Sequence, residues 1–125
     1  FDVDKAWQAV HFALAGDPWS TAGPLGQTVL GGEPFGPAVG PEPARWLPAD
    51  AVRAIAQQLA ALSPEQFEQR LDFPAMQRAE VYPMIWDEDP EADGLIGYVC
   101  GGYEQLRDGY AHAAGAGHGF VITLR

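Results

Sequence analysis

The sequence predicts an α+β fold: a helix-rich single domain in which several helices pack around a central helix, beside a small mixed or antiparallel sheet that includes the C-terminal strand. Apolar residues at helical spacing in residues 4–16 and 48–62 predict two of the helices. The run FVITLR at 120–125 is rich in β-branched residues and predicts a strand. A chain of 125 residues with 47% apolar side chains is long enough for one core, so residues 1–125 are assigned to one domain.

Residues 4–16 form the predicted central helix. Gly16 follows the last apolar position, as a glycine that ends a helix does. Phe12 lies opposite the main apolar stripe, so we expect both sides of this helix to be buried. One edge of the helix gathers Asp4, Trp7 and His11. The main stripe consists of Val3, Ala6, Trp7, Val10, Ala13 and Leu14.

Glycine and proline dominate the next part of the chain. Residues 17–23 predict a loop, and residues 24–30 fit either a short helix or an extended stretch. The sequence GGE at 31–33 predicts a flexible turn. Between residues 34 and 43 prolines and glycines are so dense that no regular element is expected, and Arg45-Trp46 ends this irregular connection.

Three helices are predicted in the middle of the chain. Residues 48–62 give the clearest helical pattern, and a capping box from Ser63 to Gln66 predicts a second helix that reaches about residue 71. These two helices are expected to form a hairpin. A further short helix is expected after the Asp72-Phe73-Pro74 restart, and Pro83 favours an extended conformation for residues 81–82.

The last helix is predicted to start at Asp89-Pro90 and to end in the glycine-rich residues 114–119. It carries two apolar stripes, so we expect it to be buried, and its small residues allow a neighbouring backbone to approach closely. The strand at 120–125 needs a partner. The candidates are residues 26–30, the region of Val81, another copy of the chain, and sequence before Phe1.

The charge of the chain bears on its partners. Seven basic and 17 acidic side chains give a formal net charge of −10. Nucleic acids and anionic membranes are therefore not expected as partners, because both require a cationic surface, and a basic protein fits better. A single cysteine, no long apolar run and no visible signal peptide make the cytoplasm the expected location.

His11 is the main candidate for acid–base chemistry. Beside Asp4, or beside Glu33 of the GGE turn, its imidazole would have the carboxylate neighbour that a general base requires. The competing interpretation is a structural histidine that bonds a loop carbonyl and braces the GGE turn. No nucleophile motif accompanies His11, and the spacing of His11, His112 and His118 fits no zinc motif, so neither a metal nor a cofactor is expected.

Large aromatic side chains are numerous for loops and helix edges. Three interpretations fit these side chains. They line a concave binding site, they anchor a protein interface, or they fill the core of a loop-rich domain. The binding candidates are Trp7, Arg45, Trp46, Tyr82 and Trp86.

The order of several motifs resembles the YfbM-like family, bacterial proteins classed as a domain of unknown function. These motifs are DVDKAWQAVHFALAG, PLGQTVLGGE, RWLPADAVRAIAQQLAAL, EVYPMIWDED and YEQLRDGYAHAAGAGHGFVITLR. The resemblance implies helices against a small sheet, with a strand before the first motif in the family, and it implies no activity.

Charge and aromatic residues together favour a non-catalytic protein-binding or regulatory module over an enzyme, and an immunity-type module is one form of it. The alternative is a small-molecule-binding protein or a hydrolase-like enzyme. In that enzyme His11 acts as base, Asp4 or Glu33 orients it, and Arg45 anchors an anion.

Overall fold

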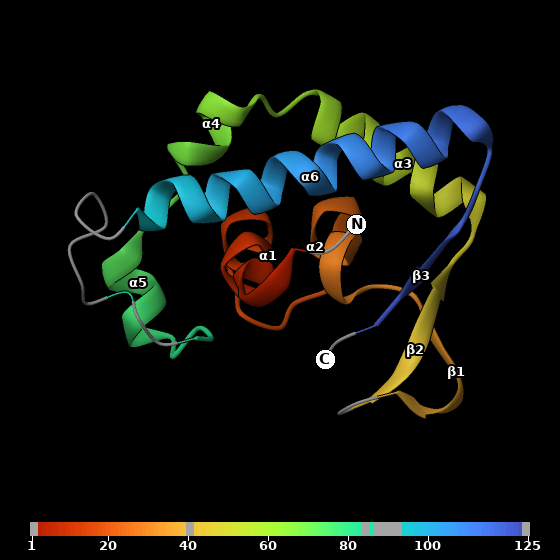
Figure 1. The fold of residues 1–125 in the computed structure, drawn as a ribbon, viewed down its shortest axis with the longest axis horizontal. Helices are drawn as coiled ribbons and strands as arrows, with labels where there is room; N and C mark the ends of the chain where they lie inside the picture. The colour runs from red at the N-terminus through yellow and green to blue at the C-terminus, as the bar shows by residue number, and fades with distance from the viewer. Residues whose placement is uncertain (1–2, 40–41, 84–85, 87–93, 124–125) are drawn as a thin grey trace.

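Helix α6 (Leu95–Ala116) runs along the long axis of the molecule in the computed structural model, and α1, α3 and α4 pack against it (Figure 1). The structure describes residues 3–39, 42–83, 86 and 94–123. Within them the fold is α+β, as the sequence predicts. The remaining elements are the 3₁₀ turn η1 (Asp4–Ala6), α1 (Trp7–Ala15), α2 (Gly23–Leu30), β1 (Glu33–Val39), β2 (Glu42–Leu47), α3 (Ala49–Ala60), α4 (Pro64–Glu68), α5 (Phe73–Arg78) and β3 (Phe120–Ile122).

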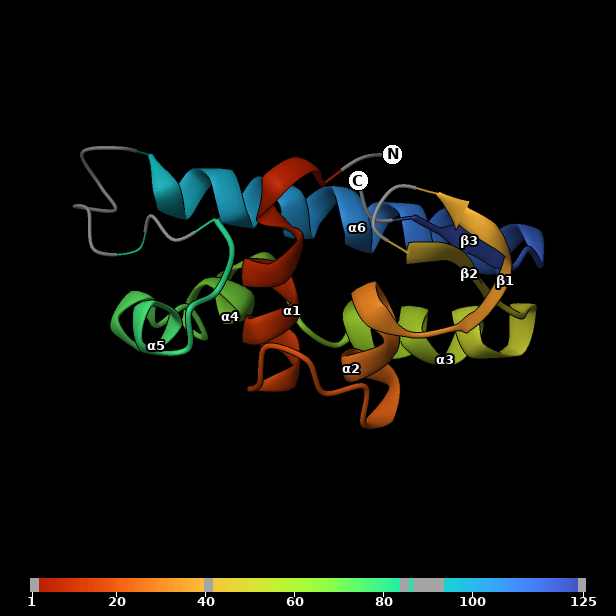
Figure 2. The ribbon, with the colours of Figure 1, turned by 90° about the horizontal axis from the view of Figure 1, so that it is seen from below.

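The predicted first helix is confirmed, and it is buried on more than one side. Gly16 ends α1 with a φ of 75° and donates its N–H to the Phe12 carbonyl at 2.8 Å. Figure 2 shows α1 crossing α6 at a steep angle. Gly102 of α6 permits this crossing, because a Cβ atom there would lie 3.3 Å from the Ala6 side chain. The close approach expected from the small residues of the last helix is therefore found.

The predicted hairpin of two helices is wrong. The capping box at Ser63 and Gln66 is present, but α4 packs against α6 and continues away from α3 (Figure 1). An aromatic contact holds α4 on α6, because Phe67 stacks on Tyr103 with ring centroids 4.0 Å apart. The Tyr103 hydroxyl also donates to the Leu62 carbonyl at 2.6 Å, so the segment between α3 and α4 is fixed to α6 as well.

The prediction of an irregular connection between residues 34 and 43 is also wrong. β1 and β2 pair as an antiparallel hairpin, and β2 pairs with β3, in the order β1-β2-β3. Proline is tolerated because β1 is an edge strand, and its pairing with β2 is interrupted between Phe35 and Ala38, next to Gly36 with a φ of 68°. β2 is therefore the partner of the C-terminal strand, which none of the sequence-based candidates identified.

Other expectations have mixed outcomes. Residues 24–30 adopt the helical alternative, and α5 follows an Asp72 side chain that accepts the Ala75 N–H at 3.0 Å. The predicted helix start at Asp89-Pro90 and the last two residues of the C-terminal strand lie outside the described residues.

No helix in the described ranges is long and apolar enough to cross a bilayer.

Candidate functional site

Arg45 of β2 holds the turn at 31–33 against the rest of the molecule. Arg45 is 7% exposed, and its guanidinium donates to the Gly31 carbonyl at 2.8 Å and to the Val29 carbonyl at 3.2 Å. Its Nε donates to the Glu42 carboxylate at 3.1 Å. These carbonyls lie at the C-terminal end of α2, the negative end of the helix dipole, so a cation is stabilising there. Arg45 therefore braces the turn at 31–33, a role that the structural interpretation of the sequence gave to His11.

Other arginines cap other helices in the same way. Arg107 of α6 donates to the Leu59 and Ala60 carbonyls at the end of α3, at 2.9 and 3.0 Å. Arg70 lies 3.5 Å from the Ala13 and Leu14 carbonyls at the end of α1. Three of the seven basic residues are therefore directed at backbone carbonyls, and few remain to neutralise the 17 carboxylates.

His11 is enclosed in the core. It has no exposed surface, and neither ring nitrogen has a hydrogen-bond partner within the described part of the chain. Burial lowers the pKa of His11, and Arg45 acts in the same direction, whereas Asp17 and the Ser20 backbone oppose this lowering without cancelling it. The neutral imidazole is the form that the folded chain prefers.

Stability is expected to fall as the solution is acidified below pH 6.5, the ordinary pKa of histidine. Because the folded-state pKa is the lower one, the unfolded chain takes up a proton first, and the free energy of unfolding decreases until the folded pKa is reached. Urea unfolding at several pH values between 7.5 and about 5 measures this slope. His11→Leu should flatten it.

His112→Gln is the matched control, because His112 is exposed near the end of α6. This variant should retain the slope of the unmodified chain. An unchanged slope in His11→Leu would show that other groups cause the acid sensitivity.

Two of the other catalytic candidates do not converge on His11. Glu33 is exposed at the start of β1, and the Arg45 guanidinium bonds to the end of α2. Asp4 belongs to η1, and its side chain lies outside what the structure describes. The pocket beside Glu33 does not include His11. The open constellation of His11, Glu33 and Arg45 that a hydrolase requires is absent from the described residues.

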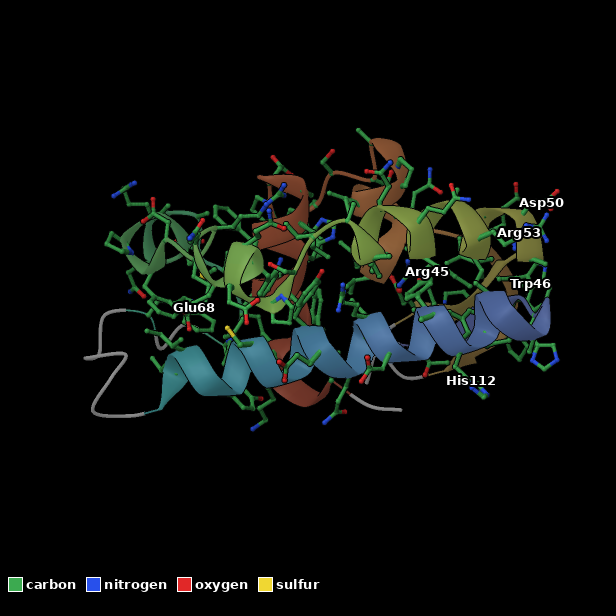
Figure 3. The ribbon with its side chains drawn as sticks, turned by 90° about the horizontal axis from the view of Figure 1, so that it is seen from above. Arg45, Trp46, Asp50, Arg53, Glu68 and His112 are labelled. Atoms are coloured by element: carbon green, nitrogen blue, oxygen red, sulfur yellow. The ribbon has the colours of Figure 1, made fainter. Side chains whose placement is uncertain are left out.

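The pocket has a volume of about 520 Å³ and lies between the end of α2, the end of β2 and the start of α3. Trp46 and Glu33 border it and occupy directly paired positions of β2 and β1. Trp46 lies at the end of the molecule where α6 ends, as Figure 3 shows. The lining residues are Thr21, Gln27, Leu30, Gly31, Gly32, Glu33, Trp46, Leu47, Pro48 and Ala51.

The predicted binding residues separate into buried and exposed groups. Arg45 and Trp86 are buried, and the Trp86 indole donates to the Val81 carbonyl at 2.8 Å. Trp7 is half-buried between Tyr82 and Trp19, with ring centroids 6.0 and 6.3 Å away. Trp46 is 46% exposed on the sheet. The predicted set therefore does not form one site.

The family model of DUF1877, a domain of unknown function, matches residues 1–123. The chain belongs to this family. The DUF1877 chain is also similar in structure to YfbM from Escherichia coli, a protein of unknown function, with a TM-score of 0.74 and 21% sequence identity over 97% of this chain and 77% of that one. No curated protein matches the chain.

Sequence reasoning missed two residues that position the surface of this DUF1877 domain. The buried Gln8 donates to the Pro18 carbonyl at 3.3 Å and accepts the Tyr82 N–H at 2.8 Å, which joins two loops. Gly119 accommodates Trp46, whose ring would lie 2.6 Å from a Cβ atom at residue 119. Gln8 could have been noticed in the sequence, because it is a polar residue in a helix expected to be buried on both sides.

Proposed function

We propose that this DUF1877 chain is a non-catalytic protein-binding module, of regulatory or immunity type, whose partner is a basic protein. The proposed contact surface is the outer sheet face, defined as Glu33, Phe35, Trp46 and Val121. The observation that carries the proposal is that three apolar side chains stand exposed in neighbouring positions of one sheet.

The strand register supports a continuous surface. Trp46 is directly paired with Glu33 on one side and with Val121 on the other, and directly paired residues share a face of the sheet. Phe35 lies two residues after Glu33 and therefore on the same face. Phe35, Trp46 and Val121 are 48%, 46% and 57% exposed. Aromatic side chains surrounded by polar ones are typical of the anchors in protein interfaces.

The charge distribution supports a basic partner. Arg45, Arg70 and Arg107 face helix ends, whereas the Glu33 side chain has no hydrogen bond or ion pair in the parts of the chain that the structure describes. The net charge of −10 accelerates encounter with a cationic surface, and this effect weakens with added salt.

The test is affinity capture with matched surface variants. The chain is immobilised, exposed to lysate of its own source cells, and compared with the double variant Phe35→Ser/Val121→Ser. We expect one stoichiometric basic protein, released by moderate salt, to bind the original chain, and the double variant to bind it at least tenfold more weakly, as hot-spot loss predicts.

Trp19→Ser is the control, because Trp19 is 65% exposed but lies on the loop after α1 and not on the sheet. It should bind the partner normally. The proposal fails if the control and the double variant lose binding equally. It also fails if no partner is retained while the pure protein turns over a small molecule, the outcome that favours the enzyme alternative built on His11.

A further inference from the structure

We propose that the pocket bordered by Glu33 and Trp46 binds the guanidinium group of an arginine side chain. This inference rests on the proposed function and makes it more specific, because the arginine would be the anchor residue of the basic partner. The pocket adjoins the outer sheet face, and Trp46 and Glu33 belong to both.

Glycine backbone forms one side of the pocket. Gly31 and Gly32 form part of its lining, and neither position accommodates a side chain. A Cβ atom at Gly31 would overlap the Gln27 carbonyl, and one at Gly32 would lie 2.8 Å from the Trp46 carbonyl oxygen. The volume of about 520 Å³ lies within the range of ligand pockets, roughly 300–1,000 Å³.

The polar groups of the lining select a cation that donates hydrogen bonds. Glu33, Gln27 and Thr21 belong to the lining, and their side chains have no hydrogen-bond partner among the described residues. Their oxygens all accept. The residues that line the pocket include no Lys, Arg or His. The guanidinium of Arg45 already donates to the Gly31 and Val29 carbonyls. An anion in the pocket would therefore have no positive charge to pair with.

The aromatic and apolar lining distinguishes guanidinium from other cations. A planar guanidinium stacks on an indole face and forms two parallel hydrogen bonds to one carboxylate, whereas an ammonium does neither. Trp46 and Glu33 are paired directly across β1 and β2, and both line the pocket. Leu30, Leu47 and Ala51 offer apolar surface to the aliphatic stem.

The test uses small probes and does not require the partner. The ¹⁵N-labelled full chain is titrated with N-acetyl-arginine methylamide, its citrulline analogue and its lysine analogue, while the indole N–H resonance of Trp46 is followed by NMR. Trp46→Phe assigns that resonance. We expect a saturable shift with the arginine probe, and binding at least about tenfold weaker for citrulline, which keeps the shape but not the charge.

Glu33→Gln should abolish the preference for arginine over citrulline. Glu68→Gln removes the same charge from an exposed residue toward the other end of the molecule (Figure 3) and should retain the preference. Equal binding of the arginine and lysine probes would overturn the guanidinium assignment, and so would the absence of a saturable shift.

These outcomes are separable from a failure of the proposed function. If a basic partner binds through Phe35 and Val121 while the arginine probe does not bind, the module stands and the arginine pocket is wrong. If the probe binds selectively and no partner is captured, the pocket stands and the protein-binding function is wrong.

Discussion

Arg45→Met is expected to lower the free energy of unfolding by about 3 kcal/mol, because the Gly31 and Val29 carbonyls lose their charged donor inside the structure. The negative end of the α2 dipole also loses its compensating cation. Methionine has a similar length, so packing changes little and the loss measures mainly the hydrogen bonds. Urea unfolding at pH 7.5 gives the difference, with the denaturant slope as a check on two-state behaviour.

Arg53→Met is the control for Arg45→Met. Arg53 is exposed and pairs with Asp50 one turn earlier in α3, so its removal should change stability by less than about 0.5 kcal/mol. The stability loss in Arg45→Lys should lie between those of Arg45→Met and Arg53→Met. A lysine ammonium keeps the charge but cannot donate to both carbonyls with the planar geometry of the guanidinium. A loss below 1 kcal/mol in Arg45→Met, of the order of a neutral hydrogen bond, would contradict the capping role.

Gly32→Ala is expected to lower the free energy of unfolding by about 3 kcal/mol, as the sum of a backbone and a steric cost. Gly32 has a φ of 92°, a conformation that L side chains rarely adopt. Its new Cβ atom would also lie 2.8 Å from the Trp46 carbonyl oxygen and 3.3 Å from the Arg45 side chain. The turn would have to move away from β2. Thermal and urea unfolding of the variant measure the loss.

Gly97→Ala is the matched control for Gly32→Ala. Gly97 lies exposed in α6, and a Cβ atom there meets nothing within 4 Å. Alanine should therefore stabilise the chain by up to about 1 kcal/mol through its helix propensity. Equal effects of the two substitutions would show that the turn at 31–33 tolerates a side chain.

The helices were predictable because their signals are local. The apolar stripe of residues 48–62, the capping box at Ser63 and the glycine at residue 16 each depend on neighbours within about two turns. The hairpin of β1 and β2 was not predictable in the same way. Proline and glycine reduce strand propensity locally, and an edge position with an irregular pairing makes them acceptable.

The candidate site was only partly visible in the sequence. Glu33 was named as a catalytic candidate and Trp46 as a binding candidate, and the strand register places them directly opposite each other. Arg45 and Trp86 have the composition of binding residues and are buried. Val121 gave no distinguishing signal, because exposure on one sheet face depends on which strand pairs with which.

The sequence by itself determined the α+β class, the positions of most helices, the acidic charge and the family resemblance. Tertiary structure alone decided the strand partners, the inward direction of the arginines and the enclosure of His11. The physical reason is the range of the interactions. Helix periodicity and capping act within a few residues, whereas Arg45 meets Val29, and β2 meets β3, only when distant segments have packed together.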